Sequence, residues 1–180
     1  MTWSAPMTAV SGATFTAAQF NQYVRDNLNS TAPALASAAS QIFVSTGVNA
    51  IAARVPTSQS VVTIQSTTST SFTDLTTVGP LISVVTGTIA IVLFASGIST
   101  ATNDSTALVS VAVSGASSVA ASDAWAIQMD GITAGNVVRY SGVHIFTGLT
   151  PGTNVFTLKY KAPAGVNATF RNREINVIPL

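Results

Sequence analysis

From residue 61 onward, short runs rich in β-branched residues alternate with turn-forming residues, and no run has the apolar spacing of a helix. Gly79-Pro80, Asp130-Gly131 and Pro151-Gly152 are typical turn sequences. Regularly spaced short strands of this kind are typical of two packed antiparallel sheets. The pattern therefore predicts a β-sandwich of the jelly-roll type over residues 59–180. The expected strands are Val61–Gln65, Ser71–Leu75, Leu81–Val85, Thr88–Ala95, Ala107–Ser114, Ala124–Met129, Val137–Phe146, Val155–Lys161, Ala168–Asn172 and Glu174–Ile178.

Two of these strands differ in how their apolar residues are arranged. Within Val155–Lys161, Phe156, Leu158 and Tyr160 alternate with polar residues, which predicts one buried and one solvent-exposed face. Thr88–Phe94 is instead apolar on both faces. Because a sandwich buries only one face of each sheet, we expect the outer face of this strand to be covered. A second copy of the chain is the favoured cover, and the chain's own arm or hairpin is the alternative.

The first 28 residues predict an extended arm followed by a helix with a well-defined start. Thr16 is placed to cap the helix, and Gln19 can bond back to the Thr16 amide, which makes a capping box. Phe15 and Phe20 are placed to pack across this start as a hydrophobic staple. We therefore expect a helix that begins just after Thr16 and ends near Leu28.

One face of this helix is expected to be apolar. Phe20, Val24 and Leu28 recur every four residues, with Tyr23 beside them. A helix of about a dozen residues is marginal by itself in water, so we expect it to dock on another surface. Arg25 and Asp26 are expected to add polar contacts at the rim. The anchoring residues are thus predicted to be Trp3, Phe15, Phe20, Tyr23, Val24, Arg25, Asp26 and Leu28.

Between the helix and the sandwich, residues 31–58 are expected to form a linker rich in small residues. Gln41–Val44 and Ala50–Val55 have the composition of strands, and Thr46–Asn49 between them is a plausible hairpin turn. A lone hairpin is not stable in water, so it must pair with another chain or with the sandwich. The chain is therefore expected to contain three segments: an anchoring arm and helix (1–30), a hairpin linker (31–58) and a sandwich knob (59–180).

The chain carries few charges, which restricts its partners. Charged residues make up 7% of the sequence, against a usual share of about 25%. A surface of hydroxyls rather than charges lacks the repulsion that keeps free proteins apart, which favours a subunit of an assembly. The net charge is +1 without a basic cluster, so no nucleic-acid partner is expected. There is no cysteine, which excludes disulfides and thiolate metal sites.

Membrane insertion is not expected either. Leu81–Ile98 is the candidate span, but Thr86-Gly87-Thr88 interrupts it and no lysine or arginine flanks it. Its two halves have the length and β-branched composition of buried strands. The amino terminus lacks the basic residues and continuous apolar run of a secretory signal, so no signal is expected.

The side chains that carry chemistry do not form a recognisable motif. His144 alternates with apolar residues along one strand, which is typical of a packing histidine. Trp125 and Tyr140 lie in apolar strands and are expected in the core rather than in a sugar site. No nucleophile elbow, paired-carboxylate motif, metal-ligand spacing or phosphate loop occurs. We therefore expect a non-enzymatic protein without catalytic residues, cofactor or metal.

Three stretches of the sequence resemble virion structural proteins of tailed bacteriophages, particularly those that infect actinobacteria. The first stretch is the arm and helix, and its helix sequence Val24–Leu28 is the most specific piece. The other two are similar to a linking motif and a β-sandwich knob of phage fibres and minor tail proteins. Together they cover nearly the whole chain. They are the arm and helix, with Trp3, Pro6, Val10–Gly12, Phe15–Asn21 and Tyr23–Leu28; Gln41–Arg54; and the C-terminal half, with Thr147–Tyr160 and the ending Ile175–Leu180.

The resemblance implies a trimeric component of the virion surface, assembled in the host cytoplasm. Residues 1–30 would attach it to the major capsid protein or another virion protein, as a capsid decoration or short head fibre. The absence of a long repetitive shaft favours this over a tail fibre. The alternative is a tail-attached minor tail or fibre protein whose knob binds a host-surface receptor or glycan.

Overall fold

The computed structural model describes residues 3–180, leaving aside the side chains of Pro33 and Ile132. The chain forms two compact units, Met1–Val55 and Pro56–Leu180. The expected segments 1–30 and 31–58 fall mainly in the first unit, and the expected knob 59–180 falls in the second. Each unit is described by itself.

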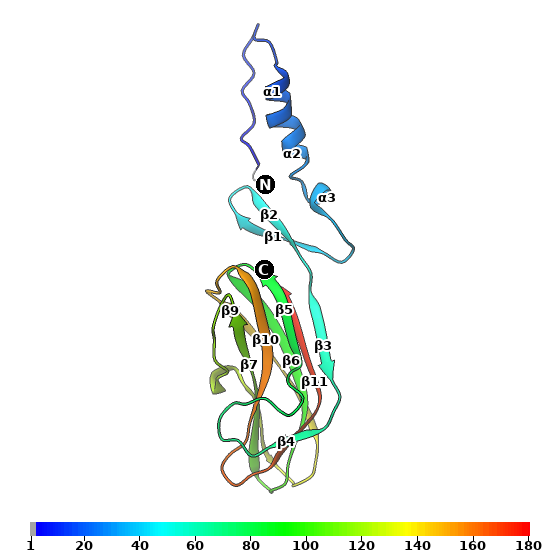
Figure 1. The fold of residues 1–180 in the computed structure, drawn as a ribbon, viewed down its shortest axis with the longest axis vertical. Coiled ribbons are helices and arrows are strands. Elements are labelled where there is room, and N and C mark those ends of the chain that lie inside the picture. The colour runs from blue at the N-terminus through cyan, green and yellow to red at the C-terminus, as the bar shows by residue number, and fades with distance from the viewer. Residues whose placement is uncertain (1–2) are drawn as a thin grey trace. The chain divides into compact units, whose positions relative to one another are not determined.

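The first unit consists of an extended arm, a helical segment and a hairpin (Figure 1). The helical segment is continuous from residue 17 to 28: α1 (Ala17–Phe20), the π-helical turn η1 (Asn21–Arg25) and α2 (Asp26–Leu28). The π turn departs from the plain helix that we expected. The short helix α3 (Ala32–Leu35) was also not expected; the proline in its first turn does not prevent it, because the first helical turn tolerates proline.

The predicted hairpin is confirmed. β1 (Ile42–Gly47) pairs antiparallel with β2 (Ala50–Arg54), and Gly47 lies opposite Ala50. The turn between them is shorter than expected because β1 continues to Gly47. Asn49 adopts a positive φ of 54°, a conformation that asparagine tolerates better than most residues.

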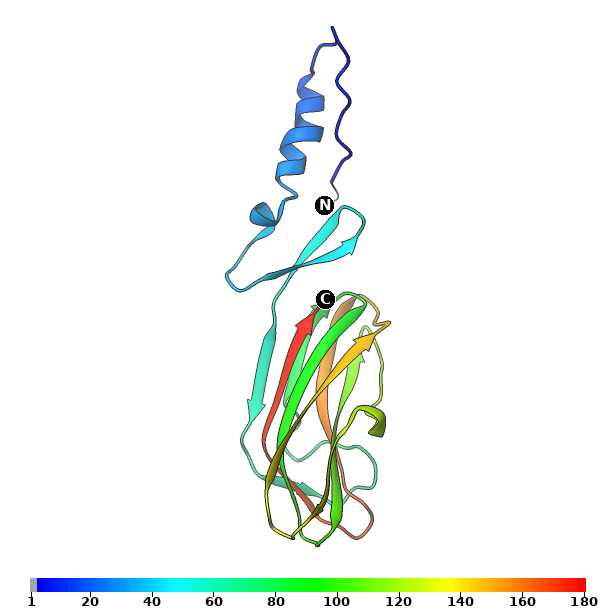
Figure 2. The same cartoon turned by 180° about the vertical axis from the view of Figure 1, so that it is seen from behind.

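The second unit is an antiparallel β-sandwich, which confirms the predicted fold class. One sheet has the order β5-β10-β7-β8, and the other has the order β3-β11-β6-β9 with β4 also paired to β11. Figures 1 and 2 show the two sheets as stacked layers. The strands are β3 (Thr57–Val61), β4 (Gln65–Thr67), β5 (Leu81–Thr86), β6 (Ile89–Thr100), β7 (Ser105–Gly115), β8 (Ile127–Ile132), β9 (Val138–Thr147), β10 (Gly152–Lys161) and β11 (Ala168–Pro179).

The strand pairing is that of a jelly roll. The outermost strands in sequence pair with each other, so that β3 and β4 pair with β11, β5 with β10, β6 with β9 and β7 with β8. All of these pairs are antiparallel. The chain is therefore connected as one long hairpin that has been rolled into two sheets, as predicted.

Five strand predictions need correction. Ser71–Leu75 is a loop that touches the sheet through a single bridge between Thr73 and Tyr160. The expected strand Val61–Gln65 spans the gap between β3 and β4. The expected strands around residues 168 and 178 are one strand, β11, with an irregularity between Arg171 and Glu174. The strand expected from Ala124 begins later, because a 3-10 turn, η2 (Asp123–Trp125), precedes β8.

The core lies between the two sheets. Phe156, Leu158 and Tyr160 are fully buried, which confirms the buried face predicted for β10. The other face is less exposed than predicted, because Thr157 is buried and Lys159 and Lys161 are half-buried. Trp125 and Tyr140 pack against this core, also as predicted. The expected two strands between residues 81 and 98 are present as β5 and β6. Among the described residues, no helix is long and apolar enough to cross a membrane.

Arg173 is buried in the second unit without any exposed surface. Its guanidinium donates hydrogen bonds to the carbonyl oxygens of Gly79 (3.0 Å), Thr77 (3.4 Å) and Thr63 (3.3 Å) and to Gln65 Oε1 (3.1 Å). These partners belong to segments that lie about a hundred residues earlier in the chain. Arg173 thus fastens the connection from β3 to β5 onto β11.

Candidate assembly interface

The start of the helix in the first unit is built as predicted. The Gln19 amide donates to Thr16 Oγ1 at 3.2 Å, and the Thr16 amide donates to Gln19 Oε1 at 2.9 Å, which completes the capping box. The rings of Phe15 and Phe20 meet edge to face with centroids 6.2 Å apart. The cap satisfies amides that the first helical turn leaves free, so the helix begins at a fixed residue.

The extended arm is held against the helix by Asn27, which is 4% exposed. Its Oδ1 accepts a hydrogen bond from the Ser4 amide (2.8 Å), and its Nδ2 donates to the carbonyl oxygens of Ser4 and Tyr23 (3.1 Å each). The neighbouring Trp3 amide donates to the Asn49 carbonyl oxygen in the hairpin turn (3.1 Å). Asn27 therefore joins the arm to the helix, and Trp3 joins the arm to the hairpin.

Asn27 was not among the predicted interface residues. An asparagine inside a helix is unfavourable on propensity, and that was the signal in the sequence. Tyr23, Asn27 and Ser30 are spaced to lie along one side of the helix, and Asn27 and Ser30 are buried. The arm therefore covers a side of the helix whose central residue, Asn27, is polar.

The predicted apolar residues are largely uncovered. Phe15 (50% exposed), Phe20 (48%), Leu28 (60%) and Trp3 (38%) remain accessible, whereas Tyr23 and Val24 are half-buried. The π turn η1 lies between Phe20 and Leu28, so these residues do not follow the spacing of one regular α-helix.

Arg25 and Asp26 form an exposed ion pair with each other, with a nitrogen–oxygen distance of 2.8 Å. An exposed pair of this kind contributes about 0–1 kcal/mol to stability. Both side chains stand at the surface of the unit, where a partner can reach them.

The first unit also contains two hollows beside these residues. One, of about 300 Å³, lies between the arm and the start of the helix and is lined by Val10, Phe15 and Gln19 among others. The other, of about 430 Å³, is lined by Trp3, Ser30 and residues of the hairpin such as Ile51. The unit thus presents exposed apolar side chains next to concave surface.

In the second unit, the outer face of β6 and β9 is apolar. Leu93 lies opposite Val143, and Ile91 lies opposite Ile145, on the side of the sheet that faces away from the core. Leu93 (40%), Val143 (63%) and Ile145 (54%) are exposed. On β6 the alternating residues point into the core; they are Ala90, Val92 and Phe94. The strand β6 is therefore apolar on both faces.

His144 packs inside the sandwich, as predicted. Its ring stacks on Trp125 with centroids 4.9 Å apart and meets Phe146 edge to face at 4.6 Å. Burial lowers the pKa of His144 below its ordinary value. Within the described part of the chain, no group of three or more His, Asp or Glu side chains could hold a metal ion.

Comparison with known proteins finds only a distant structural similarity. No family model and no curated protein matches the chain. A solved structure that it resembles is that of infectious bursal disease virus, Gx strain, with 12% sequence identity and a TM-score of 0.37. The similarity covers 76% of this chain and 39% of the viral one. A TM-score of this size carries no argument about function.

Proposed function

We propose that the protein is a non-enzymatic structural subunit of a virion, attached to the particle by its first unit and carrying its second unit as a knob. The observation that carries this proposal is the solvent exposure of three large apolar side chains, Phe15, Phe20 and Leu28. These residues are about half exposed or more, on a helix that is capped and fastened to its arm. The resemblance of this segment to phage virion proteins supports the same function.

Burial of these exposed apolar side chains can supply the free energy for attachment to a partner. Burying a large apolar side chain completely is worth roughly 1.5–3 kcal/mol, so each half-exposed residue can contribute about half of that on docking. The capping box and the Asn27 hydrogen bonds already order the helix and arm. Binding therefore costs little further conformational entropy.

Attachment to the capsid, as a decoration or short head fibre, is our first choice, and the partner is then the major capsid protein. The alternative is a tail-attached protein whose knob binds a host receptor. Imaging particles that carry a label on the knob distinguishes the two: label on the head supports the first, and label on the tail supports the second.

The attachment is tested with a chain that begins at Pro56, where the second unit begins. This unit has its own hydrophobic core and both of its sheets pair within the unit, so we expect it to fold by itself. Purified particles should lack the truncated protein, as measured by immunoblot. Truncated protein that still joins particles at the normal level would refute the proposal.

A point variant tests the helix itself. Leu28→Glu places a charge among the exposed apolar residues, and we expect at least tenfold less protein on particles, because that charge would have to be buried. Gln22→Glu, at an exposed polar position of the same helix, is the matched control and should leave incorporation unchanged. Docking through Leu28 would be refuted if both variants were incorporated into particles to the same extent, whether that extent is reduced or normal.

A further inference from the structure

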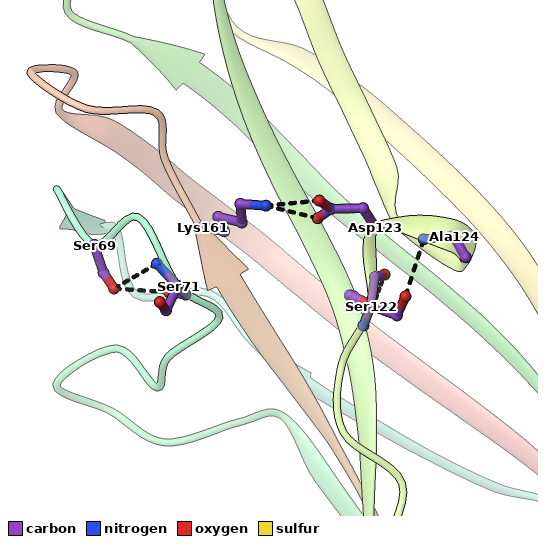
Figure 3. A network of polar contacts seen from close by, with 7 residues as sticks. Ser69, Ser71, Ser122, Asp123, Ala124 and Lys161 are labelled. Carbon is purple, nitrogen blue, oxygen red and sulfur yellow. Dashed lines mark hydrogen bonds and ion pairs between the residues drawn. The ribbon is translucent and has the colours of Figure 1, made fainter.

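A hollow of about 600 Å³ lies on the outer face of the β5-β10-β7-β8 sheet. Its floor is formed by Ala112 of β7 and by Lys159 and Lys161 of β10. Figure 3 shows Lys161 between the loop that carries Ser69 and Ser71 and the loop that carries Ser122 and Asp123. The lining on the two sides comes from Thr70, Ser71 and Phe72 and from Ala120, Ala121, Ser122 and Asp123.

The loop before β5 is fixed to the sheet. The amide of Thr73 donates to the Tyr160 carbonyl oxygen (3.0 Å), and the Tyr160 amide donates back (2.9 Å). Ser69 accepts from the Ala162 amide through its carbonyl oxygen (2.8 Å), and its hydroxyl donates to the Ser71 carbonyl oxygen (2.7 Å). Phe72, between these anchor points, is therefore held in place.

The loop after β7 is fixed equally well. The Ser110 hydroxyl donates to the Ser122 carbonyl oxygen (2.8 Å) and accepts from the Ser122 amide (3.2 Å). Farther along, Val113 and Val119 exchange both backbone hydrogen bonds. With both walls tied to the sheet, the hollow is preformed and lies within the size range of small-ligand sites.

The charges around the hollow are paired. Lys161 Nζ lies 2.9 and 2.7 Å from the two carboxylate oxygens of Asp123, and Lys159 Nζ lies 2.7 Å from Asp74 Oδ2. Lys161 Nζ also lies 5.4 Å from the centre of the Phe72 ring. Two lysines and two aspartates cancel, so the site offers no net charge to a phosphate or a polyamine. It does offer strong donors and acceptors next to an apolar ring.

We propose that this hollow binds a neutral saccharide. Sugar hydroxyls would donate to the Asp123 carboxylate and accept from the Lys161 ammonium, because a neutral polyhydroxyl ligand needs both kinds of partner. The ring of Phe72 supplies apolar surface for the C–H face of the sugar. The proposal does not depend on how the protein is attached to a particle.

The proposal is tested with the purified full chain on an array of neutral and anionic oligosaccharides, followed by titration of the retained sugar by NMR. We expect retention of neutral sugars. Phe72→Ala and Asp123→Asn should each weaken binding at least tenfold. Ala112→Leu fills the floor of the hollow without changing a charge and should abolish binding. Asp130→Asn, at an exposed aspartate bonded to Thr106 elsewhere in the unit, is the matched control and should bind normally.

Unfolding curves recorded by circular dichroism verify that each variant is folded. Retention of anionic sugars alone would overturn the proposal. So would a failure to retain any neutral sugar at millimolar concentration, or neutral binding that survives in folded Phe72→Ala and Ala112→Leu.

Discussion

At the residue scale, Arg173 makes the clearest contribution to stability. Replacing it with methionine keeps much of its volume but leaves the carbonyl oxygens of Thr63 and Thr77 without their donor. The Gly79 carbonyl oxygen keeps a hydrogen bond from the Tyr160 hydroxyl, and Gln65 Oε1 keeps one from the Thr77 amide. We expect Arg173→Met to lower the free energy of unfolding of the second unit by about 2–5 kcal/mol, as measured in urea, because each buried carbonyl oxygen without a donor costs about 1–3 kcal/mol. Arg139→Met, which removes an exposed ion pair with Glu174, is the control and should cost less than about 1 kcal/mol. Similar losses in both variants would contradict this role.

His144 should make the second unit sensitive to pH. Burial lowers the pKa of His144 in the folded state, so the unfolded chain takes up a proton at higher pH than the folded one. The contribution of neutral His144 to the stability of the folded unit is fully present above the ordinary histidine pKa of about 6.5 and is lost as pH falls below that value. We expect a lower melting temperature at pH ~5 than at pH ~7.5. His144→Phe retains an aromatic ring against Trp125, and in this variant the difference in melting temperature between the two pH values should shrink. An unchanged difference would mean that other groups cause the pH dependence.

At the scale of elements, the arm and the helix of the first unit depend on each other through Asn27. Asn27→Ala removes three hydrogen bonds and leaves both backbone groups of Ser4 without a partner. We expect a loss of about 1–3 kcal/mol in the first unit, seen as faster amide hydrogen exchange at Ser4. Exchange in the second unit should not change. Gln22→Ala is the control, and exchange at Ser4 that is equally fast in both variants would refute the role of Asn27.

At the scale of the whole molecule, we propose that the exposed apolar residues Leu93, Val143 and Ile145 on the outer face of β6 and β9 pair with further copies of the chain, as a trimer. These residues lie side by side on two paired strands, and the low charge of the chain does not oppose association. Native mass measurement at micromolar concentration should give about three times the 18.3 kDa of one chain.

Val143→Glu should reduce this species to the monomer, because each copy would bury an unpaired carboxylate. Val85→Glu introduces the same change at a residue that is 53% exposed on the outer face of the other sheet, and it should leave the trimer intact. A wild-type protein that is a monomer under these conditions would exclude the proposal.

Local pattern by itself determined much of this protein. The capping box of Thr16 and Gln19, the packing of Phe15 on Phe20 and the hairpin between residues 42 and 54 follow from residues close together in the chain. The jelly roll was also predictable, because alternation and turn residues define its strands before any pairing is known. Such features depend on neighbours that the sequence places side by side.

The tertiary structure decided which polar residues are buried and where surfaces become concave. Asn27 meets Ser4 across 23 residues, and Arg173 meets Gly79 across 94. The walls of the hollow at Lys161 come from loops that the strand order brings together. Sequence spacing cannot give these contacts, because each depends on the register of strands and on loop paths fixed only when distant segments pack. Helix spacing likewise could not reveal the π turn between Phe20 and Leu28.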